Sequence, residues 1–96
     1  CPKFTHTFSI LGKKWNGLII EALLVKDTMR FKGLSASING CSDRVLCERL
    51  KELEDEHIVV RNTYEGENRI DYSLTERGQE LREVMSTVHR WSDKWN

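Results

Sequence analysis

Hydrophobic residues recur every three or four positions through the first 40 residues, which is the spacing of amphipathic helices. Pro2 suits the first turn of one helix and Gly12 suits its end, and a second run ends around residues 26–27. A third, shorter run is broken at Asn39-Gly40. The three predicted helices are marked by Phe4, Phe8 and Leu11, then by Trp15, Leu18, Ile19, Ala22 and Leu23, and then by Phe31, Leu34 and Ile38.

From position 42 the pattern predicts a fourth helix and then changes to the alternation of strands. Ser42 can cap this helix, and the acidic segment 54–56 ends it. The β-branched run 58–60 starts a strand, residues 65–68 turn the chain, and an alternating run returns. The apolar positions are Leu46, Leu50 and Leu53 in the helix and Ile70, Tyr72 and Leu74 in the returning strand. This order predicts a winged helix-turn-helix, an α+β fold that is mostly α.

The outward face of the fourth helix carries charged side chains that can meet DNA. Two such helices related by a dimer axis would enter successive major grooves about 34 Å apart. In that arrangement Arg44 reads base edges, Lys51 lies nearer the phosphates, and Arg69 contacts the backbone from the wing. The residues predicted to face double-stranded DNA are Ser42, Asp43, Arg44, Cys47, Glu48, Lys51 and Arg69.

The last predicted helix, which Thr75 can cap, carries an apolar stripe to the end of the chain. The stripe consists of Leu81, Val84, Met85, Val88, Trp91 and Trp95. A small domain has little core of its own with which to cover this stripe and the aromatic stripe of the first helix. We therefore predict a homodimer whose interface is formed by the N- and C-terminal helices. The alternative is that these aromatic residues cover the core of their own chain.

Composition adds few constraints. The 96 residues suffice for one domain, spanning residues 1–96, and a chain with 39% hydrophobic and 31% charged residues is an ordinary globular one. No apolar run approaches the roughly 20 residues of a membrane span, so we expect a cytoplasmic protein with no membrane partner. The chain opens on Cys1 and not on Met, which suggests that residues precede it, and no segment resembles a signal peptide.

The formal net charge is zero, yet the charges are unevenly distributed. Residues 1–51 hold nine Lys or Arg against four acids, and the remaining residues hold six against eleven. This asymmetry favours one basic face that meets phosphates, although halves of a sequence need not be halves of a structure.

Several motifs together resemble the HxlR-type branch of the MarR-like winged-helix transcriptional regulators. They are the segment 8–15 (FSILGKKW), Arg30-Phe31, the leucines within 46–53, and the segment 72–75 (YSLT) with Gly78. Cys1-Pro2-Lys3 before the Gly-Lys-Lys-Trp motif is similar to the quinone- and diamide-sensing repressors of Gram-positive bacteria. The resemblance implies a repressor that binds a palindromic operator as a dimer and is released when Cys1 is modified. Relatives usually carry Ile at position 41 and prolines in the wing.

The position of Cys1 also favours reactivity. It would lie at or just before the start of a helix, with Lys3 nearby, and both features favour the thiolate. A thiolate can add to a quinone, be oxidised to a sulfenic acid, or form a disulfide with a second thiol. Cys41 and Cys47 are the candidate partners, although a free cysteine is commonly a small buried hydrophobic residue. Quinones or other electrophiles and oxidants are therefore the expected inducers.

Other chemistry finds little support. There is no Cys-x-x-Cys or His-Glu-x-x-His spacing, so we predict no metal and no cofactor. No nucleophile has an evident base and no Gly-rich phosphate loop is present, so we predict no enzyme. Two alternatives remain. One is a regulator that reversibly holds a small aromatic inducer near Phe4, Phe8 and Trp15, and the other is a protein-interaction module with a neutral or apolar outward helix face.

Overall fold

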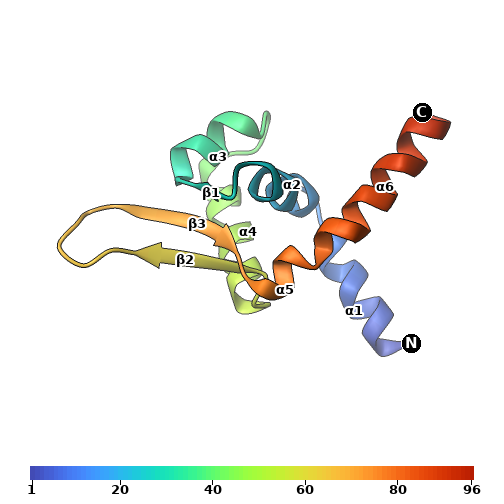
Figure 1. Ribbon diagram of the computed structural model, residues 1–96, viewed down its shortest axis with the longest axis horizontal. Coiled ribbons are helices and arrows are strands. Elements are labelled where there is room, and N and C mark those ends of the chain that lie inside the picture. The colour runs from blue at the N-terminus through green and yellow to red at the C-terminus, as the bar shows by residue number, and fades with distance from the viewer.

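The computed structural model describes residues 1–96, which form six helices and one three-stranded sheet. In chain order the elements are α1 (Pro2–Leu11), α2 (Asn16–Lys26), β1 (Thr28–Met29), α3 (Phe31–Ser37), α4 (Asp43–Asp55), β2 (Val59–Thr63), β3 (Ile70–Leu74), α5 (Glu76–Gln79) and α6 (Leu81–Trp95). Figure 1 shows α2, α3, α4 and the β2–β3 hairpin grouped together, with α1 and α6 projecting from the opposite side. The predicted winged helix-turn-helix is confirmed.

The α1–α2 region follows the predicted pattern with one correction. α1 begins at Pro2, whose missing N–H costs nothing in a first helical turn, and it ends before Gly12 as predicted. Trp15 was expected inside the second helix but is its cap, with a left-handed φ of 81°, and α2 begins at Asn16. Trp15 fits the apolar spacing of α2 although it lies outside the helix, because its side chain packs against the same core as the apolar face of α2.

The core lies where α2, α3, α4 and the sheet meet. Its 13 buried residues are Ile19, Ile20, Leu23, Leu24, Leu34, Ile38, Leu46, Leu50, Leu53, Ile58, Val59, Tyr72 and Leu74. α2 supplies four of them and runs through the centre of the group in Figure 1. Each fully buried aliphatic side chain contributes about 1.5–3 kcal/mol to folding. The core therefore holds the two helices of the helix-turn-helix against a common support.

The sheet has the order β1-β3-β2, and both pairings are antiparallel. β2 and β3 form the wing, in register from Val59 opposite Leu74 to Thr63 opposite Ile70. The strand begins at Val59, one residue later than the β-branched run suggested. β1 was not predicted, because two residues are too few to display an alternating pattern. Gly66 has a φ of 77° in the turn of the wing.

The C-terminal helix is interrupted near its start. Thr75 is a cap as predicted, since its hydroxyl accepts a hydrogen bond from the Gly78 amide at 3.1 Å, but it caps the four-residue α5. α6 then begins at Leu81. A Cβ at Gly78 would collide with the Ile58 carbonyl oxygen, so glycine permits α5 to pass close to the start of the wing. None of the helices combines the length and apolar character needed to cross a membrane.

Candidate nucleic-acid interface and sensor

α4 has the two-sided character required of a recognition helix. The Ser42 hydroxyl accepts a hydrogen bond from the Val45 amide at 3.2 Å, which caps the helix as predicted. The Ser35 hydroxyl donates to Asp43 at 2.7 Å and so joins α3 to the first turn of α4. The leucines of the inner side are fully buried, as predicted: Leu46, Leu50 and Leu53. Packing and capping thus fix which side of α4 faces outward.

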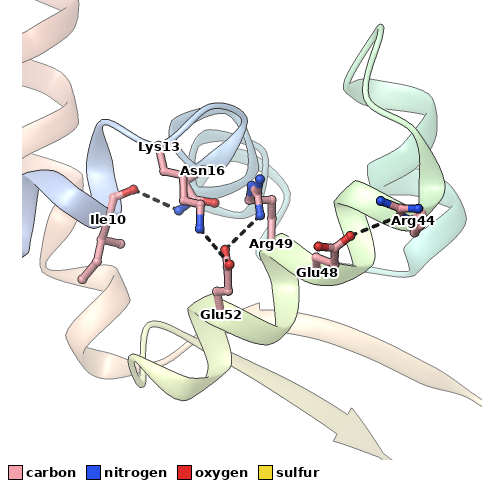
Figure 2. A network of polar contacts seen from close by, with 7 residues as sticks. All are labelled: Ile10, Lys13, Asn16, Arg44, Glu48, Arg49 and Glu52. Carbon is pink, nitrogen blue, oxygen red and sulfur yellow. Dashed lines mark hydrogen bonds and ion pairs between the residues drawn. The ribbon is translucent and has the colours of Figure 1, made fainter.

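The outward side of α4 is polar and charged. Ser42, Asp43, Arg44, Cys47, Glu48 and Lys51 are all exposed, so the structure gathers these predicted DNA-facing residues on one surface. The Arg44 side chain is 88% exposed and lies 3.4 Å from Glu48, one helical turn away (Figure 2). Such an exposed pair contributes only about 0.3–0.5 kcal/mol. Arg44 can therefore leave Glu48 for another acceptor at little cost.

The wing contains a buried carboxylate that the sequence pattern did not reveal. Asp71 is 1% exposed and accepts hydrogen bonds from Asn62 at 2.9 Å, from the Tyr64 hydroxyl at 2.9 Å, and from Arg69 at 3.1 Å. The Arg69 guanidinium also lies 4.6 Å from the centre of the Tyr64 ring. Arg69, predicted to contact phosphates, is thus held near the tip of the wing, just before β3 begins, with about half of its side chain still exposed.

These contacts determine how the wing groups ionise. Burial by itself would raise the pKa of Asp71, but hydrogen bonds from Asn62, Tyr64 and Arg69 outweigh burial and hold the pKa below its usual value. The hydrogen bond to Asp71 raises the pKa of the Tyr64 hydroxyl and the pKa of Arg69. Asp71 therefore stays ionised and fixes both side chains. No signal of this burial was visible in the sequence, because the alternation of apolar residues at positions 70, 72 and 74 places Asp71 on the polar side of the strand, where an acid is expected to face solvent.

The three cysteines occupy different surroundings, and all are free thiols. Cys1 is exposed at the cap position of α1, whose first turn contains no acidic residue. Cys41 is partly buried and packs against the core, and its thiol donates to the Ser42 carbonyl at 3.6 Å. Cys47 is exposed on the outward side of α4.

The residues predicted to line an inducer pocket are not brought together within one chain. Phe4 and Phe8 pack against each other with ring centroids 4.9 Å apart, and both are more than half exposed. Trp15 lies at the start of α2 with its ring beside Gly40. The two cavities beside α1, of about 250 and 210 Å³, are lined by other residues. No group of three or more His, Cys, Asp or Glu side chains is arranged to hold a metal ion.

The terminal helices expose the apolar stripes that the sequence predicts. No residue of α1 or α6 is buried, and the large apolar side chains of these two helices that are more than 40% exposed are Phe4, Phe8, Val84, Val88, Trp91 and Trp95. The alternative, that these aromatic residues cover the core of their own chain, does not describe this arrangement. An exposed apolar surface of this kind marks an interaction site.

Comparison with known proteins gives a consistent answer. A family model described as HxlR-like helix-turn-helix matches residues 10–96. The HTH-type transcriptional regulator YodB of Bacillus subtilis is 43% identical over 96 residues, which cover 99% of this chain and 85% of YodB. A structure of reduced YodB superposes with a TM-score of 0.88, covering 99% of this chain and 93% of that one. The crystal structure of quinone-bound YodB superposes with a TM-score of 0.86, covering 99% of this chain and 100% of that one. The sequence identity is 42% for both structures.

Proposed function

Because this chain belongs to the HxlR-like helix-turn-helix family of transcriptional regulators, we propose that it is a dimeric repressor released from its operator when Cys1 is modified. The observation that carries the sensing part is an exposed thiol at the start of α1, a helix whose apolar face is uncovered. The similarity to a regulator with a quinone-bound crystal structure supports the same chemistry here. Quinones are the proposed inducers, and oxidants of the diamide type are a related class.

The DNA contacts are assigned to the outward side of α4 and to the wing. Arg44 lies at the N-terminal turn of α4, is almost fully exposed, and has a planar donor group suited to the O6 and N7 acceptors of guanine. Lys51, two turns further along, is proposed to contact a phosphate. Arg69 is held by Asp71 and Tyr64 at the wing and is proposed to meet the neighbouring backbone. The charged face of α4 argues against a protein-interaction module.

The dimer is proposed to form through α1 and α6 of two chains. Their exposed aromatic and aliphatic side chains would cover one another across a two-fold axis. This arrangement places two α4 helices on one duplex, and linking two half-site contacts can raise the affinity by a factor of about 10² or more. Operator affinity therefore depends on the spacing that α1 and α6 impose.

Release follows from this dependence. The Cys1 thiolate would add to a quinone ring and form a carbon–sulfur bond, while the ring takes up a proton from water and tautomerises to a hydroquinone. The added ring would lie on α1 beside Phe4 and Phe8, in the proposed interface. A packed interface responds to added volume by shifting its helices, and the two α4 helices then lose their spacing. Nearly complete release requires the adduct to disfavour DNA by roughly 5 kcal/mol.

The experiment is to treat the wild-type chain and Cys1→Ser with p-benzoquinone and to measure binding to a duplex selected by the wild-type chain from a random library. Intact mass and peptide mapping locate the adduct. We expect equal DNA affinity before treatment, one ring on Cys1, and release only for the wild-type chain. Release of Cys1→Ser by the quinone, or an adduct found only on Cys41 or Cys47, would contradict the proposal.

A further inference from the structure

A group of ion pairs joins the α1–α2 turn to the recognition helix. The Lys13 ammonium donates to Glu52 of α4 at 2.8 Å, and Arg49 of α4 donates to the other oxygen of Glu52 at 3.1 Å. Figure 2 shows Lys13 and Asn16 reaching from the turn toward Arg49 and Glu52 on α4. The hydrogen bond from Lys13 lowers the pKa of Glu52, so the carboxylate is the stable partner. We call Lys13, Arg49 and Glu52 the α1–α4 joint.

The turn that carries Lys13 is itself fixed to α1. The Asn16 carboxamide donates to the Ile10 carbonyl at 2.9 Å, and the Asn16 amide donates to the Lys13 carbonyl at 3.1 Å. Asn16 is 2% exposed, so water does not compete for these bonds. A second contact links α1 directly to the end of α4, where His6 lies 2.9 Å from Glu56. Movement of α1 therefore carries the Lys13 side chain with it.

Polar contacts hold α1 beside α4, and apolar packing of α1 is confined to its last turn. α1 has no buried residue, and a cavity of about 250 Å³ lies between it and the C-terminal half of α4. Ile10 and Leu11, at its last turn, are the α1 side chains that pack against the core. A helix attached in this way can tilt without disturbing the core, and its tilt is felt by α4 through the ion pairs. Networks of hydrogen bonds and ion pairs of this type can carry energetic coupling between two sites.

We propose that the α1–α4 joint positions the recognition helix and transmits movements of α1 to it. Lys13 and Glu52 are then positioning residues for DNA binding, although neither lies among the residues assigned to the DNA surface. The inference rests on the proposed function for the source of the movement, which is modification of Cys1. The positioning role itself requires only that the chain binds DNA.

Two buried polar atoms give the joint room for a second arrangement. The Asn16 carboxamide oxygen and the Arg49 Nε are both buried and have no hydrogen-bond partner in this structure. One is an acceptor and the other is a donor, and they belong to the two sides of the joint. A displacement of α4 that brought the Asn16 oxygen and the Arg49 Nε together would let them form a hydrogen bond. This bond would offset part of the free energy lost when the ion pair at Glu52 breaks. The joint can thus change geometry without leaving buried groups unpaired.

The test is a charge-exchange series measured by fluorescence anisotropy on the selected duplex. Lys13→Glu and Glu52→Lys each place like charges at positions 13 and 52, whereas the double variant restores opposite charges at these two positions. We expect each single variant to lose about fivefold in affinity, the effect of one partly exposed ion pair, and the double variant to recover to within about twofold of wild type. Lys14→Glu and Glu54→Lys are the matched controls, since neither residue forms an ion pair.

Rescue by the exchange is a result that loss of charge or general destabilisation does not give. The positioning role would be overturned if the affinity losses of the two single variants multiplied in the double variant. It would also be overturned if Lys14→Glu lost as much DNA affinity as Lys13→Glu. The same variants are then compared before and after p-benzoquinone, and we expect the quinone-induced loss to be at least fivefold smaller in the single variants. If the quinone-induced loss of affinity is the same in the single variants as in the wild-type chain, the joint does not transmit the movement of α1. A wild-type chain that ignores quinone would contradict sensing by Cys1, while the exchange series still decides the positioning role.

Discussion

Removing the Trp91 side chain should separate the proposed dimer. Trp91 is 63% exposed in the single chain, and an aromatic side chain presents up to about 250 Å². About 160 Å² is therefore available to a partner, which corresponds to about 4 kcal/mol per protomer if it is fully covered. If half is covered, Trp91→Ala costs about 2 kcal/mol per protomer and about 4 kcal/mol in a symmetric dimer. That loss raises the dissociation constant roughly 10³-fold.

Sedimentation velocity over a concentration series measures this constant directly. Asp93→Ala is the matched control, because Asp93 is exposed on the same helix and lies on the side opposite Trp91 and Val88. We expect Asp93→Ala to sediment like the wild-type chain and Trp91→Ala to be monomeric at micromolar concentration. The reasoning fails if Trp91→Ala keeps the wild-type dissociation constant, or if the wild-type chain is itself a monomer under these conditions.

The remaining predictions concern DNA contacts and the wing. Arg44→Ala should weaken binding to the selected duplex by about 1–3 kcal/mol and leave non-specific binding nearly unchanged, so unchanged affinity in a titration would refute its base-reading role. Arg69→Ala should weaken both kinds of binding alike and reduce the slope of affinity against salt, and a loss confined to the selected duplex would count against a phosphate contact. The lowered pKa of Asp71 means that its contribution to the free energy of unfolding is fully present above about pH 4, near its ordinary value, and is lost as the pH falls through the folded value. Asp71→Asn should therefore remove this acid-side dependence in chemical unfolding measured at several pH values, and an unchanged pH profile would contradict the assignment.

Local features of the site were predictable from the sequence, because they depend on neighbouring residues. The outward side of α4 follows from the spacing of its leucines, which fixes the direction of Arg44 and Lys51. Ser42 indicated where α4 begins, and Pro2 indicated where α1 begins. The proposed sensor was found because a cysteine before a proline and a helical run is visible in the order of residues.

Contacts between distant segments were decided only by the tertiary structure. Lys13 and Glu52 are 39 positions apart, and nothing in either segment indicates that a turn and a helix will meet there. Asp71 is buried because Asn62, Tyr64 and Arg69 converge on it, and an isolated strand would expose it. The left-handed Trp15 and the two-residue β1 likewise exist because the core and β3 hold them. Periodicity and capping act within a few residues and can be recognised in the sequence, whereas the pairing of charges from distant segments depends on which surfaces the fold brings together.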